Sequence, residues 1–544
     1  MKQSFCLSTP RVVRAGFFIF SVLQQPLGDA AVLRGVVSDF LTGKPVARAR
    51  VTIEAVGNIR GQIPPPSLTD ANGAFALPQL SPGAYLLSVH KKGFVRSRFG
   101  QRQWNAPGTP IVLEKDSLFS ADLKLHRPSA VMGEVLDENH LGLAGVSVYA
   151  WKTGRTLKLA AGAETDDRGF FRIAGLPPGR YLVRTGSKEL EDGQGILPTF
   201  FGGAIRASEA TPVDLNLDRE VVKLTIVPRQ GRLCNLSGTV TGGPPGKVIL
   251  YTDTGKREVS VSPGGQFSID QLAPGEYELL AESGPGAALR VAQSRIVLAK
   301  DNENVALTLS AAPRLRVRCE SAAGRLPAMQ GVSIFVRRRE ESADSQSLRI
   351  TCDENLPILP GRWEFAASSP PDMYVAEVRN AIAAENSYDV HVNLEQSTEV
   401  TVIFASQSGT LSGKAIAADG ESAIGAPVFL NAVEVDLRSR LGGARMVRAN
   451  EKGEYRFSGL PPGKYEVISS FDIEDPGEAQ WPLGTGKPVT MDPNGNVQLD
   501  ISVQEFRDAG LIGKDGGNEH LMVKGNLTDK LIGETRERFP HGDE

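Results

Sequence analysis

The chain has 544 residues, 41% of them hydrophobic, and a formal net charge of −3 at pH 7. This length is enough for several domains, and the hydrophobic content argues against a disordered chain. With 60 Lys and Arg against 63 Asp and Glu, there is no basic excess for binding nucleic acid or anchoring to a membrane surface.

Residues 1–30 have the order of a secretory signal peptide. Three basic residues precede the apolar run Ala15–Leu23, and small residues follow at 28–30. Nine apolar residues are too few to span a bilayer, and the run lacks the period-two pattern of a buried first strand. We therefore expect cleavage after Ala30 and export to the periplasm, the outer membrane or the extracellular space, with no transmembrane segment left in the mature chain.

A six-residue phrase with a central Pro-Gly pair then occurs five times, as LSPGAY, LPPGRY, LAPGEY, ILPGRW and LPPGKY. Successive Pro-Gly pairs lie 96, 96, 86 and 102 residues apart. This period is too long for a solenoid and fits a row of small domains. The Pro, Gly and aromatic positions are Pro82, Gly83, Tyr85, Pro178, Gly179, Tyr181, Pro274, Gly275, Tyr277, Pro360, Gly361, Trp363, Pro462, Gly463 and Tyr465.

Each phrase predicts a turn followed by a strand. Pro presets φ and Gly supplies the positive φ of a type II turn, while alternating apolar residues after the turn indicate a half-buried strand. A Gly-x-aromatic step lies upstream of four phrases, and Asp70, Asp166 and Asn450 open the turn that leads into three of these steps. We expect a β-hairpin in every unit, with the aromatic residue at the start of its second strand.

An opening strand and a closing pair of strands also recur in each unit, and no window has a convincing helical period. Short strands at this spacing, broken by Gly and Pro, predict an all-β chain: a tandem array of about five Ig-like or transthyretin-like β-sandwiches with little helix. The expected units are residues 31–127, 128–229, 230–311, 312–408 and 409–505. The third and fourth are divergent, and 506–544 form a polar tail that we expect to be mostly disordered.

The run GVVSDFLTGKPVARARVTIEA…TDANGAFALPQLSPGAYLLSVHKKGF resembles the carboxypeptidase regulatory-like domain, and the second and fifth units are similar to it. The resemblance implies a seven-stranded transthyretin-like sandwich, in a fold grouped with carbohydrate-binding-like domains. The layout is similar to that of secreted multi-module bacterial proteins. No activity transfers with the family, because function resides in sites rather than folds.

A search for catalytic motifs finds neither a His-Glu-x-x-His helix nor a Gly-x-Ser-x-Gly elbow. Asp70, Asp166 and Asp353 recur at one turn, but as single acids in separate units, whereas a glycosidase needs two carboxyl groups across one cleft. The six His residues lack metal-ligand spacing. We therefore expect that the protein is not an enzyme and that it binds no cofactor or metal.

The remaining candidates are aromatic side chains and cysteines. If Val148 and Ala150 point into the sandwich, Tyr149 and Trp151 point outward side by side, as a possible sugar platform, and Trp104 and Trp481 lie in irregular stretches. Packing between modules is the alternative for all four. An oxidising compartment would allow Cys319 and Cys352 to form a disulfide; the alternative is that they are small buried side chains.

Short linkers containing Pro predict an elongated, semi-rigid rod. The leading functional hypothesis is a non-catalytic envelope or extracellular scaffold that binds an unknown envelope protein or polysaccharide and no nucleic acid. Two alternatives stay open: a carbohydrate-binding protein that uses exposed aromatics, and an accessory module array of an envelope complex.

Overall fold

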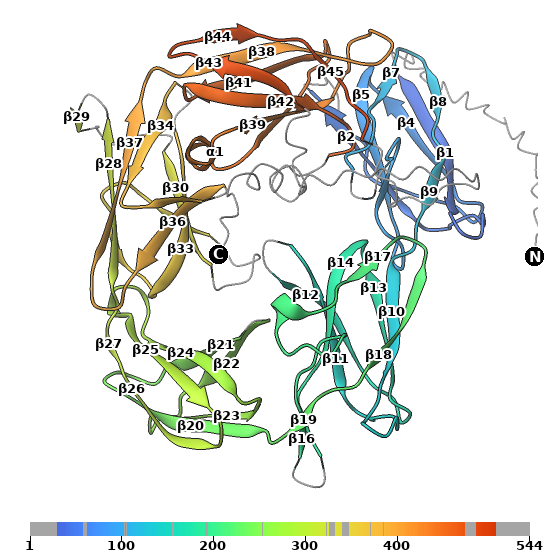
Figure 1. The fold of residues 1–544 in the computed structure, drawn as a ribbon. Helices are drawn as coiled ribbons and strands as arrows, with labels where there is room; N and C mark the ends of the chain where they lie inside the picture. The colour runs from blue at the N-terminus through green and yellow to red at the C-terminus, as the bar shows by residue number, and fades with distance from the viewer. Residues whose placement is uncertain are drawn as a thin grey trace, which may run out of the picture.

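The computed structural model describes residues 30–506, apart from 58–62, 103, 105, 155–156, 191–193, 253, 322–323, 326–331, 340–346, 370–371, 385 and 474–485. Five groups of strands follow one another along the chain, and we call them modules 1 to 5 (Figure 1). The described part of the chain has one α-helix, α1 (Val435–Leu441), and two 3₁₀ turns, η1 (Ala207–Glu209) and η2 (Gly286–Ala288). The prediction of an all-β array with little helix is confirmed.

Modules 1 and 2 have closely similar strand orders. Module 1 contains β1 (Ala31–Asp39), β2 (Arg50–Val56), β3 (Ser67–Leu68), β4 (Ala74–Leu80), β5 (Gly83–His90), β6 (Ser97–Arg98), β7 (Ile111–Leu113), β8 (Leu118–Ser120) and β9 (Leu123–Leu125). Module 2 contains β10 (Ser129–Val135), β11 (Ser147–Lys152), β12 (Lys158–Glu164), β13 (Phe170–Leu176), β14 (Gly179–Thr185), β15 (Lys188–Glu189), β16 (Gly195–Ile196), β17 (Val213–Leu215), β18 (Glu220–Ile226) and β19 (Gln230–Gly231).

The other three modules vary this plan. Module 3 contains β20 (Cys234–Thr241), β21 (Lys247–Thr252), β22 (Gly255–Ser260), β23 (Gln266–Leu272), β24 (Gly275–Ser283), β25 (Arg290–Leu298), β26 (Asn302–Thr308) and β27 (Ser310–Ala311). Module 4 contains β28 (Arg314–Ser321), β29 (Gly324–Arg325), β30 (Ser333–Arg338), β31 (Leu348–Ile350), β32 (Asn355–Pro357), β33 (Gly361–Ser368), β34 (Tyr374–Arg379), β35 (Ile382–Ala384), β36 (Ser387–Val392) and β37 (Thr398–Ala405). Module 5 contains β38 (Gly409–Ile416), β39 (Pro427–Ala432), β40 (Arg445–Arg448), β41 (Glu454–Leu460), β42 (Gly463–Ser469), β43 (Lys487–Met491), β44 (Asn496–Gln498) and β45 (Ile501–Ser502).

Each module is a sandwich of two sheets around its own apolar core. In module 2 one sheet has the order β13-β10-β18 and the other β12-β11-β14-β17. The opening strand β10 lies between an antiparallel neighbour, β13, and a parallel one, β18. A small extra sheet joins β19 to β16, so residues 230–231 pair with module 2 rather than with the third unit, where the sequence pattern places them.

The expected hairpin at the Pro-Gly phrase is wrong in all five modules. The strand before the phrase and the strand after it belong to different sheets: β4 pairs with β1, for example, whereas β5 pairs with β2. The phrase therefore carries the chain across the end of the sandwich. Gly83 has φ of +151° and Gly179 +143°, wider than the value of about +80° of a type II turn, in a region open only to glycine.

One hydrogen bond repeats at this crossing and explains the aromatic position. The Tyr85 hydroxyl donates to the Ser81 carbonyl at 2.8 Å, four residues earlier in the chain. The equivalent bonds are Tyr181 to Pro177, Tyr277 to Ala273 and Tyr465 to Pro461, at 2.7, 2.7 and 2.6 Å. In module 4 the indole Nε1 of Trp363 donates to the Leu359 carbonyl at 2.9 Å. The phrase thus needs an aromatic ring that also carries a donor.

The recurring glycine of the opening strand has a different cause. A Cβ on Gly35 would lie 1.8 Å from the Ala121 carbonyl oxygen, and one on Gly413 would lie 1.8 Å from that of Leu499. These carbonyls come from the closing strand, which is interrupted there, between β8 and β9 in module 1. Module 4 has Val317 at this position, and its closing strand β37 pairs with β28 in unbroken register. Glycine thus marks the modules in which the closing strand bulges toward the opening strand.

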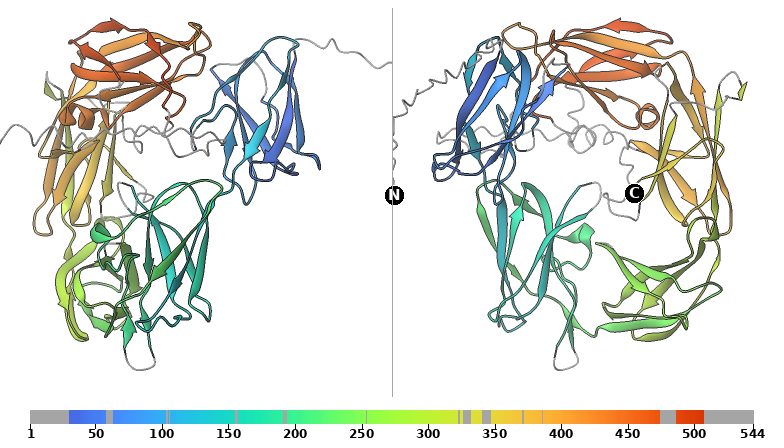
Figure 2. Two further views of the ribbon diagram at one scale, coloured as in Figure 1. Left: turned by 45° about the vertical axis from the view of Figure 1, so that its right-hand side comes forward. Right: turned by 180° about the vertical axis from the view of Figure 1, so that it is seen from behind.

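The array curls into a ring rather than extending as the expected rod (Figures 1 and 2). Module 5 returns to module 1, where Arg102 bonds to Asp472 across a sequence separation of 370. Short linkers limit flexing but do not set the direction in which successive modules bend. That direction depends on the side-chain contacts at each joint.

Candidate interaction surfaces at the joints between modules

The predicted sugar platform on β11 is not exposed. Trp151 does lie on the opposite face of β11 from the core residues Val148 and Ala150, but its side chain is buried, with 7% of the residue exposed. Phe200, from the segment before β17, lies 6.4 Å from the Trp151 ring, and the Arg184 guanidinium lies 5.8 Å from its centroid. The outward direction was predicted correctly, and the exposure was wrong because a distant segment covers this face.

The other aromatic candidates also contact protein. Tyr149 is half-buried, with its ring 5.6 Å from that of Trp151. Trp104 of module 1 is half-buried, and Lys152 of module 2 places its Nζ 5.1 Å from the Trp104 centroid. Trp481 lies outside the described residues. The two described tryptophan candidates therefore pack within or between modules.

Two of the three recurring turn acids, Asp70 and Asp166, accept hydrogen bonds from the backbone of their own turn. Asp70 Oδ1 accepts from the amides of residues 72 and 74, both at 2.8 Å, and Asp166 Oδ1 accepts from those of residues 168 and 170. Asn450 Oδ1 makes the same two bonds, at 2.9 Å each. An amide oxygen replaces the carboxylate without change in geometry, which supports a turn role.

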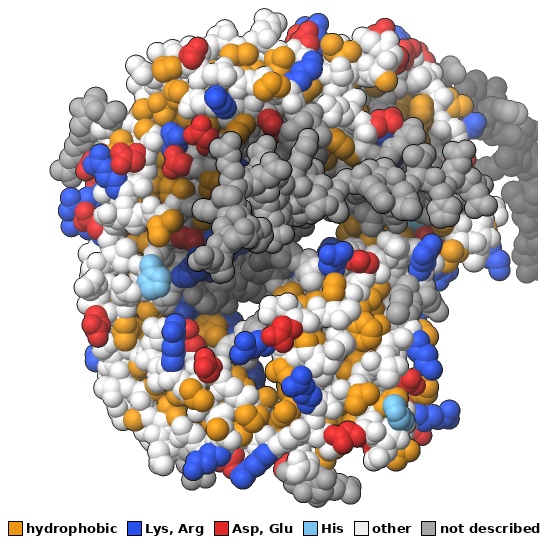
Figure 3. Space-filling model, in the orientation of Figure 1, with side chains coloured by type: hydrophobic (Ala, Val, Ile, Leu, Met, Phe, Trp, Pro, Cys, Tyr) orange, Lys and Arg blue, Asp and Glu red, His pale blue; other side chains and the backbone are white. Residues whose placement is uncertain are grey.

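No metal cluster appears among the described residues. No three His, Cys, Asp or Glu side chains there lie close enough to share a metal ion. A cavity of ≈ 30 Å³ at the edge of module 1 is lined in part by Trp104, His126 and Arg96. That volume suits a water rather than a sugar ring. On the face drawn in Figure 3, acidic and basic side chains are interspersed.

At the joint between modules 1 and 2, the linker residues His126 and Arg127 bond to acids of both modules. Arg127 donates through Nη2 to Asp39 of module 1 at 2.6 Å, and its backbone amide donates to Asp218 of module 2 at 2.7 Å. His126 Nδ1 lies 2.5 Å from the other Asp218 oxygen. Burial alone would raise the pKa of Asp39, but hydrogen bonds from Arg127 and two backbone amides outweigh it and lower that pKa.

The next two joints each place an arginine on aromatic rings. Arg184 of module 2 lies 5.2 Å from the Phe200 centroid and donates to Thr254 of module 3 at 3.1 Å. Arg338 of module 4 is only 1% exposed; it lies 4.8 Å from the Tyr251 centroid of module 3 and donates to the Tyr251 hydroxyl. A desolvated guanidinium on an aromatic face is a favourable pairing.

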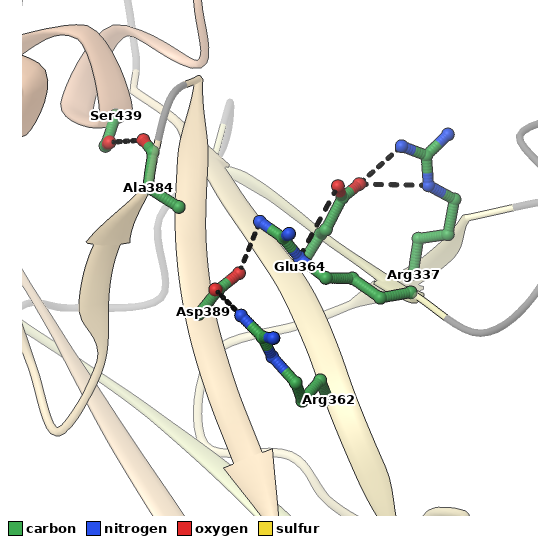
Figure 4. A network of polar contacts seen from close by, with 7 residues as sticks. Arg337, Arg362, Glu364, Ala384, Asp389 and Ser439 are labelled. Carbon is green, nitrogen blue, oxygen red and sulfur yellow. Dashed lines mark hydrogen bonds and ion pairs between the residues drawn. The ribbon is translucent and has the colours of Figure 1, made fainter. Parts of the chain in front are cut away.

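Helix α1 forms the joint between modules 4 and 5. From α1, Ser439 donates to the Ala384 carbonyl (Figure 4). Arg440 of the same helix donates to the Ala376 carbonyl at 3.3 Å. Tyr388 of module 4 donates to Asp436 at 3.1 Å. Burial raises the pKa of Tyr388, and the Asp436 carboxylate raises it further, so the phenol stays a donor.

An ion-pair network lies beside this joint on β33 and β36 (Figure 4). Asp389 accepts from Arg362 at 2.7 Å and pairs with Arg339 at 2.8 Å. Glu364 accepts from Arg337 Nε at 3.1 Å. The acids on these two strands are therefore neutralised by arginines of their own module.

Arg102 closes the ring. Its Nε donates to Asp472 of module 5 at 3.0 Å, and its Nη1 pairs with Glu505. The Asp472 side chain is 2% exposed, which makes this the more buried of the two pairs. Arg102 and Trp104 belong to one stretch between β6 and β7, so this stretch contacts both neighbours of module 1 in the ring.

An arginine thus lies at every joint, and sequence reasoning found none of the five. Arg102, Arg127, Arg184, Arg338 and Arg440 occupy unrelated positions of the repeat. Their partners lie far away in sequence or on another module, so no local pattern indicates them. The one local signal is the irregular stretch FGQRQWNAPG, which attracts attention for its tryptophan rather than for Arg102.

A disulfide joins Cys319 on β28 to Cys352, 33 residues further on, with a Cα–Cα distance of 5.5 Å. It ties the opening strand of module 4 to the turn before β32. Cys234 is a free, buried cysteine in the core of module 3.

Residues 32–114 match the family model of the carboxypeptidase regulatory-like domain, so module 1 is a domain of this family. No curated protein matches the chain. Similar solved structures include the TIE protein of Bacillus anthracis, at 12% identity and a TM-score of 0.16 over 69% of this chain and 74% of that one. The minor pilin GBS52 of Streptococcus agalactiae has 16% identity and a TM-score of 0.23, over 37% and 97%. The major pilin subunit BcpA of Bacillus cereus has 11% and 0.15, over 87% and 99%.

Proposed function

We propose that the protein is an exported, non-catalytic scaffold whose five modules hold components of the cell envelope at fixed positions around a ring. The observation that carries this proposal is the set of five joints, each with an arginine contact: at the first joint Arg127 of the linker bonds to both modules, and at the other four an arginine side chain of one module reaches another module. Domains on short linkers without such contacts move relative to one another. Such an array would not hold bound components at fixed distances from each other. Contacts at every joint give the module faces a defined arrangement.

Export rests on two independent features. Residues 1–30 have the order of a signal peptide, and the disulfide between Cys319 and Cys352 is a bond that persists in oxidising compartments. No helix among the described residues is long and apolar enough to cross a membrane. N-terminal sequencing of the exported protein should start at Ala31. An intact Met1 on protein retained in the cytoplasm would contradict export.

An envelope protein is the favoured partner, rather than a polysaccharide. Trp151 is covered, and Trp104 already has a lysine of the next module on its ring, which counts against the sugar platform that the sequence suggested. Capture from the native envelope with the full chain should recover the same proteins reproducibly. Binding on a glycan array that is lost in Trp104→Ala would favour the sugar alternative instead.

Scaffolding, as opposed to simple binding, depends on the joints. Arg338→Ala removes the guanidinium between modules 3 and 4 and leaves the module faces in place. We expect this variant to capture each partner singly but to recover pairs of partners less efficiently. Arg295→Ala, at an exposed position of β25, is the matched control. Equal recovery of pairs by both variants would refute the scaffold and leave an ordinary binding protein.

A further inference from the structure

The joint between module 5 and module 1 differs from the other four. Modules 1 to 5 are joined in sequence by four linkers, whereas the fifth joint connects the two ends of the array, at Arg102 and Asp472. This is the only joint that can separate without the linker holding the two modules close. The ring can therefore open at this joint while the other four remain intact.

The two faces of this joint fit each other closely. A Cβ on Gly425 of module 5 would lie 2.7 Å from Cγ of Pro110 and 3.0 Å from Cγ1 of Val56, so the backbone of module 5 rests directly on module 1. Gly57 similarly lies against the Glu451 side chain, because a Cβ on this glycine would lie 3.4 Å from Oε1. The contact combines apolar packing with an ion pair.

The ion pair makes the two faces of this joint opposite in charge. Asp472 has a side chain that is 2% exposed, and its two oxygens accept from Arg102 at 3.0 Å and from the Phe506 amide at 2.9 Å. Glu505 adds a second acid on the same side. The module 1 face thus contributes the cation and the module 5 face the anions, so the faces are complementary to each other and not to themselves.

We propose that this joint is also a self-assembly contact, in which module 1 of one copy binds module 5 of a second copy. An interface between two unlike faces is heterologous, and repeating it between copies gives closed rings or open filaments. The partner is a second copy of this chain, recognised by the same Arg102–Asp472 pair. This goes beyond the proposed scaffold function, because it needs no other component of the envelope.

Closure within one chain competes with assembly between chains. Ends held by the same chain experience an effective concentration of the order of millimolar. The wild-type protein is therefore a closed monomer at micromolar concentration, and assembly between copies follows when closure is blocked or when copies are crowded. The proposal is tested by blocking closure without removing both faces.

Charge reversal separates the two faces. Arg102→Asp places an acid against both Asp472 and Glu505 within one chain. Asp472→Arg places a second basic group against Arg102 and leaves Glu505 as the remaining anion, so we expect neither variant to close. Mixed together, the Arg102→Asp chain supplies an intact module 5 face and the Asp472→Arg chain an intact module 1 face. Sedimentation velocity of an equimolar micromolar mixture should show a species of at least twice the monomer mass, while each variant alone stays monomeric.

Two controls keep the result interpretable. The double variant Arg102→Asp/Asp472→Arg restores opposite charges within one chain and should return to a closed monomer with the small-angle scattering profile of the wild type. Arg34→Asp, which reverses an exposed charge on β1, should resemble the wild type throughout. Circular dichroism and thermal melting check that each variant is folded.

A mixture that stays monomeric, with both single variants folded, would overturn the proposal. Self-association of either single variant alone would also overturn it, because it would assign assembly to a different surface. A doubled mass in the mixture that disappears when either partner carries the double variant would support the Arg102–Asp472 contact between copies.

Discussion

The hydrogen bond from the phrase aromatic to the carbonyl four residues earlier can be tested by deleting one oxygen atom. Tyr465 is the most informative position, because it is 1% exposed and its hydroxyl donates to the Pro461 carbonyl at 2.6 Å. Tyr465→Phe keeps the ring and removes the donor. It leaves a buried carbonyl without this partner, which costs about 1–3 kcal/mol. Tyr465→Ala, which also empties the ring site, should cost about 3–5 kcal/mol.

The same bond in module 3 is a matched control. Tyr277 donates to Ala273 at 2.7 Å, but its side chain is half-buried, so water can replace the lost hydroxyl. Tyr277→Phe should therefore cost about 0.5–1 kcal/mol, less than the same change at Tyr465. The comparison tests the effect of burial, because the substitution is the same and the two bonds are of nearly equal length.

Hydrogen exchange read by mass spectrometry on the full chain is the suitable assay. A five-module protein does not unfold in one step, so a single melting temperature does not report one module. Exchange measures the local opening free energy of peptides from β41 and β42. Unchanged protection of these peptides in Tyr465→Phe, or equal losses in the two variants, would refute the reasoning.

Three further predictions follow from particular contacts. Burial raises the pKa of Tyr181 to about 12. The neutral form of Tyr181 therefore stabilises module 2 by about 3 kcal/mol at most below pH 10, and this contribution is lost as the pH rises toward 12. Subtracting the 295 nm titration curve of Tyr181→Phe from that of the wild type should give a transition with its midpoint near pH 12 rather than pH 10. Gly463→Ala should cost about 1–3 kcal/mol and loosen the joint formed by α1, because φ is +151° and the new Cβ would lie 2.4 Å from Leu437 of α1; unchanged exchange in α1 would contradict this. Replacing Cys319 and Cys352 by Ala should lower the stability of module 4 by about 2–4 kcal/mol, since the bond closes a loop of 33 residues; urea unfolding followed by exchange in β28 is the check, and equal stability would show that the bond is dispensable.

The sequence predicted the elements well because their signals are local. The Asp or Asn turn, the Gly-x-aromatic step and the Pro-Gly phrase each specify a backbone conformation within a few residues, and alternation identifies the strands. Alternation does not say which sheet a strand joins. A strand after the phrase has the same pattern whether it pairs with its predecessor or crosses to the opposite sheet, so the hairpin was the natural but incorrect interpretation.

Contacts between distant segments could not be predicted in the same way. Trp151 faces outward as expected, but its exposure depends on Phe200, which arrives from a segment 49 positions later in the chain. Gly35 is needed because a carbonyl of the closing strand leaves no room for a Cβ at this position. Module 4 has Val317 there instead, and its closing strand pairs in unbroken register. Arg102 reaches Asp472 only because the four joints between modules 1 and 5 all turn the array in the same direction.

The joints also account for the fate of the aromatic residues that suggested a sugar-binding protein. Trp104 contacts Lys152 across the first joint, and Tyr251 receives Arg338 across the third. A flat ring and a guanidinium or ammonium group form a contact that is specific in direction and tolerates partial solvation, which suits small faces between modules. The same property makes such rings attractive to sugars, so sequence alone does not separate the two uses. Once the five modules have closed into their circular array, neighbouring modules occupy these aromatic faces. A partner must then recognise the outer surfaces that the joints leave open.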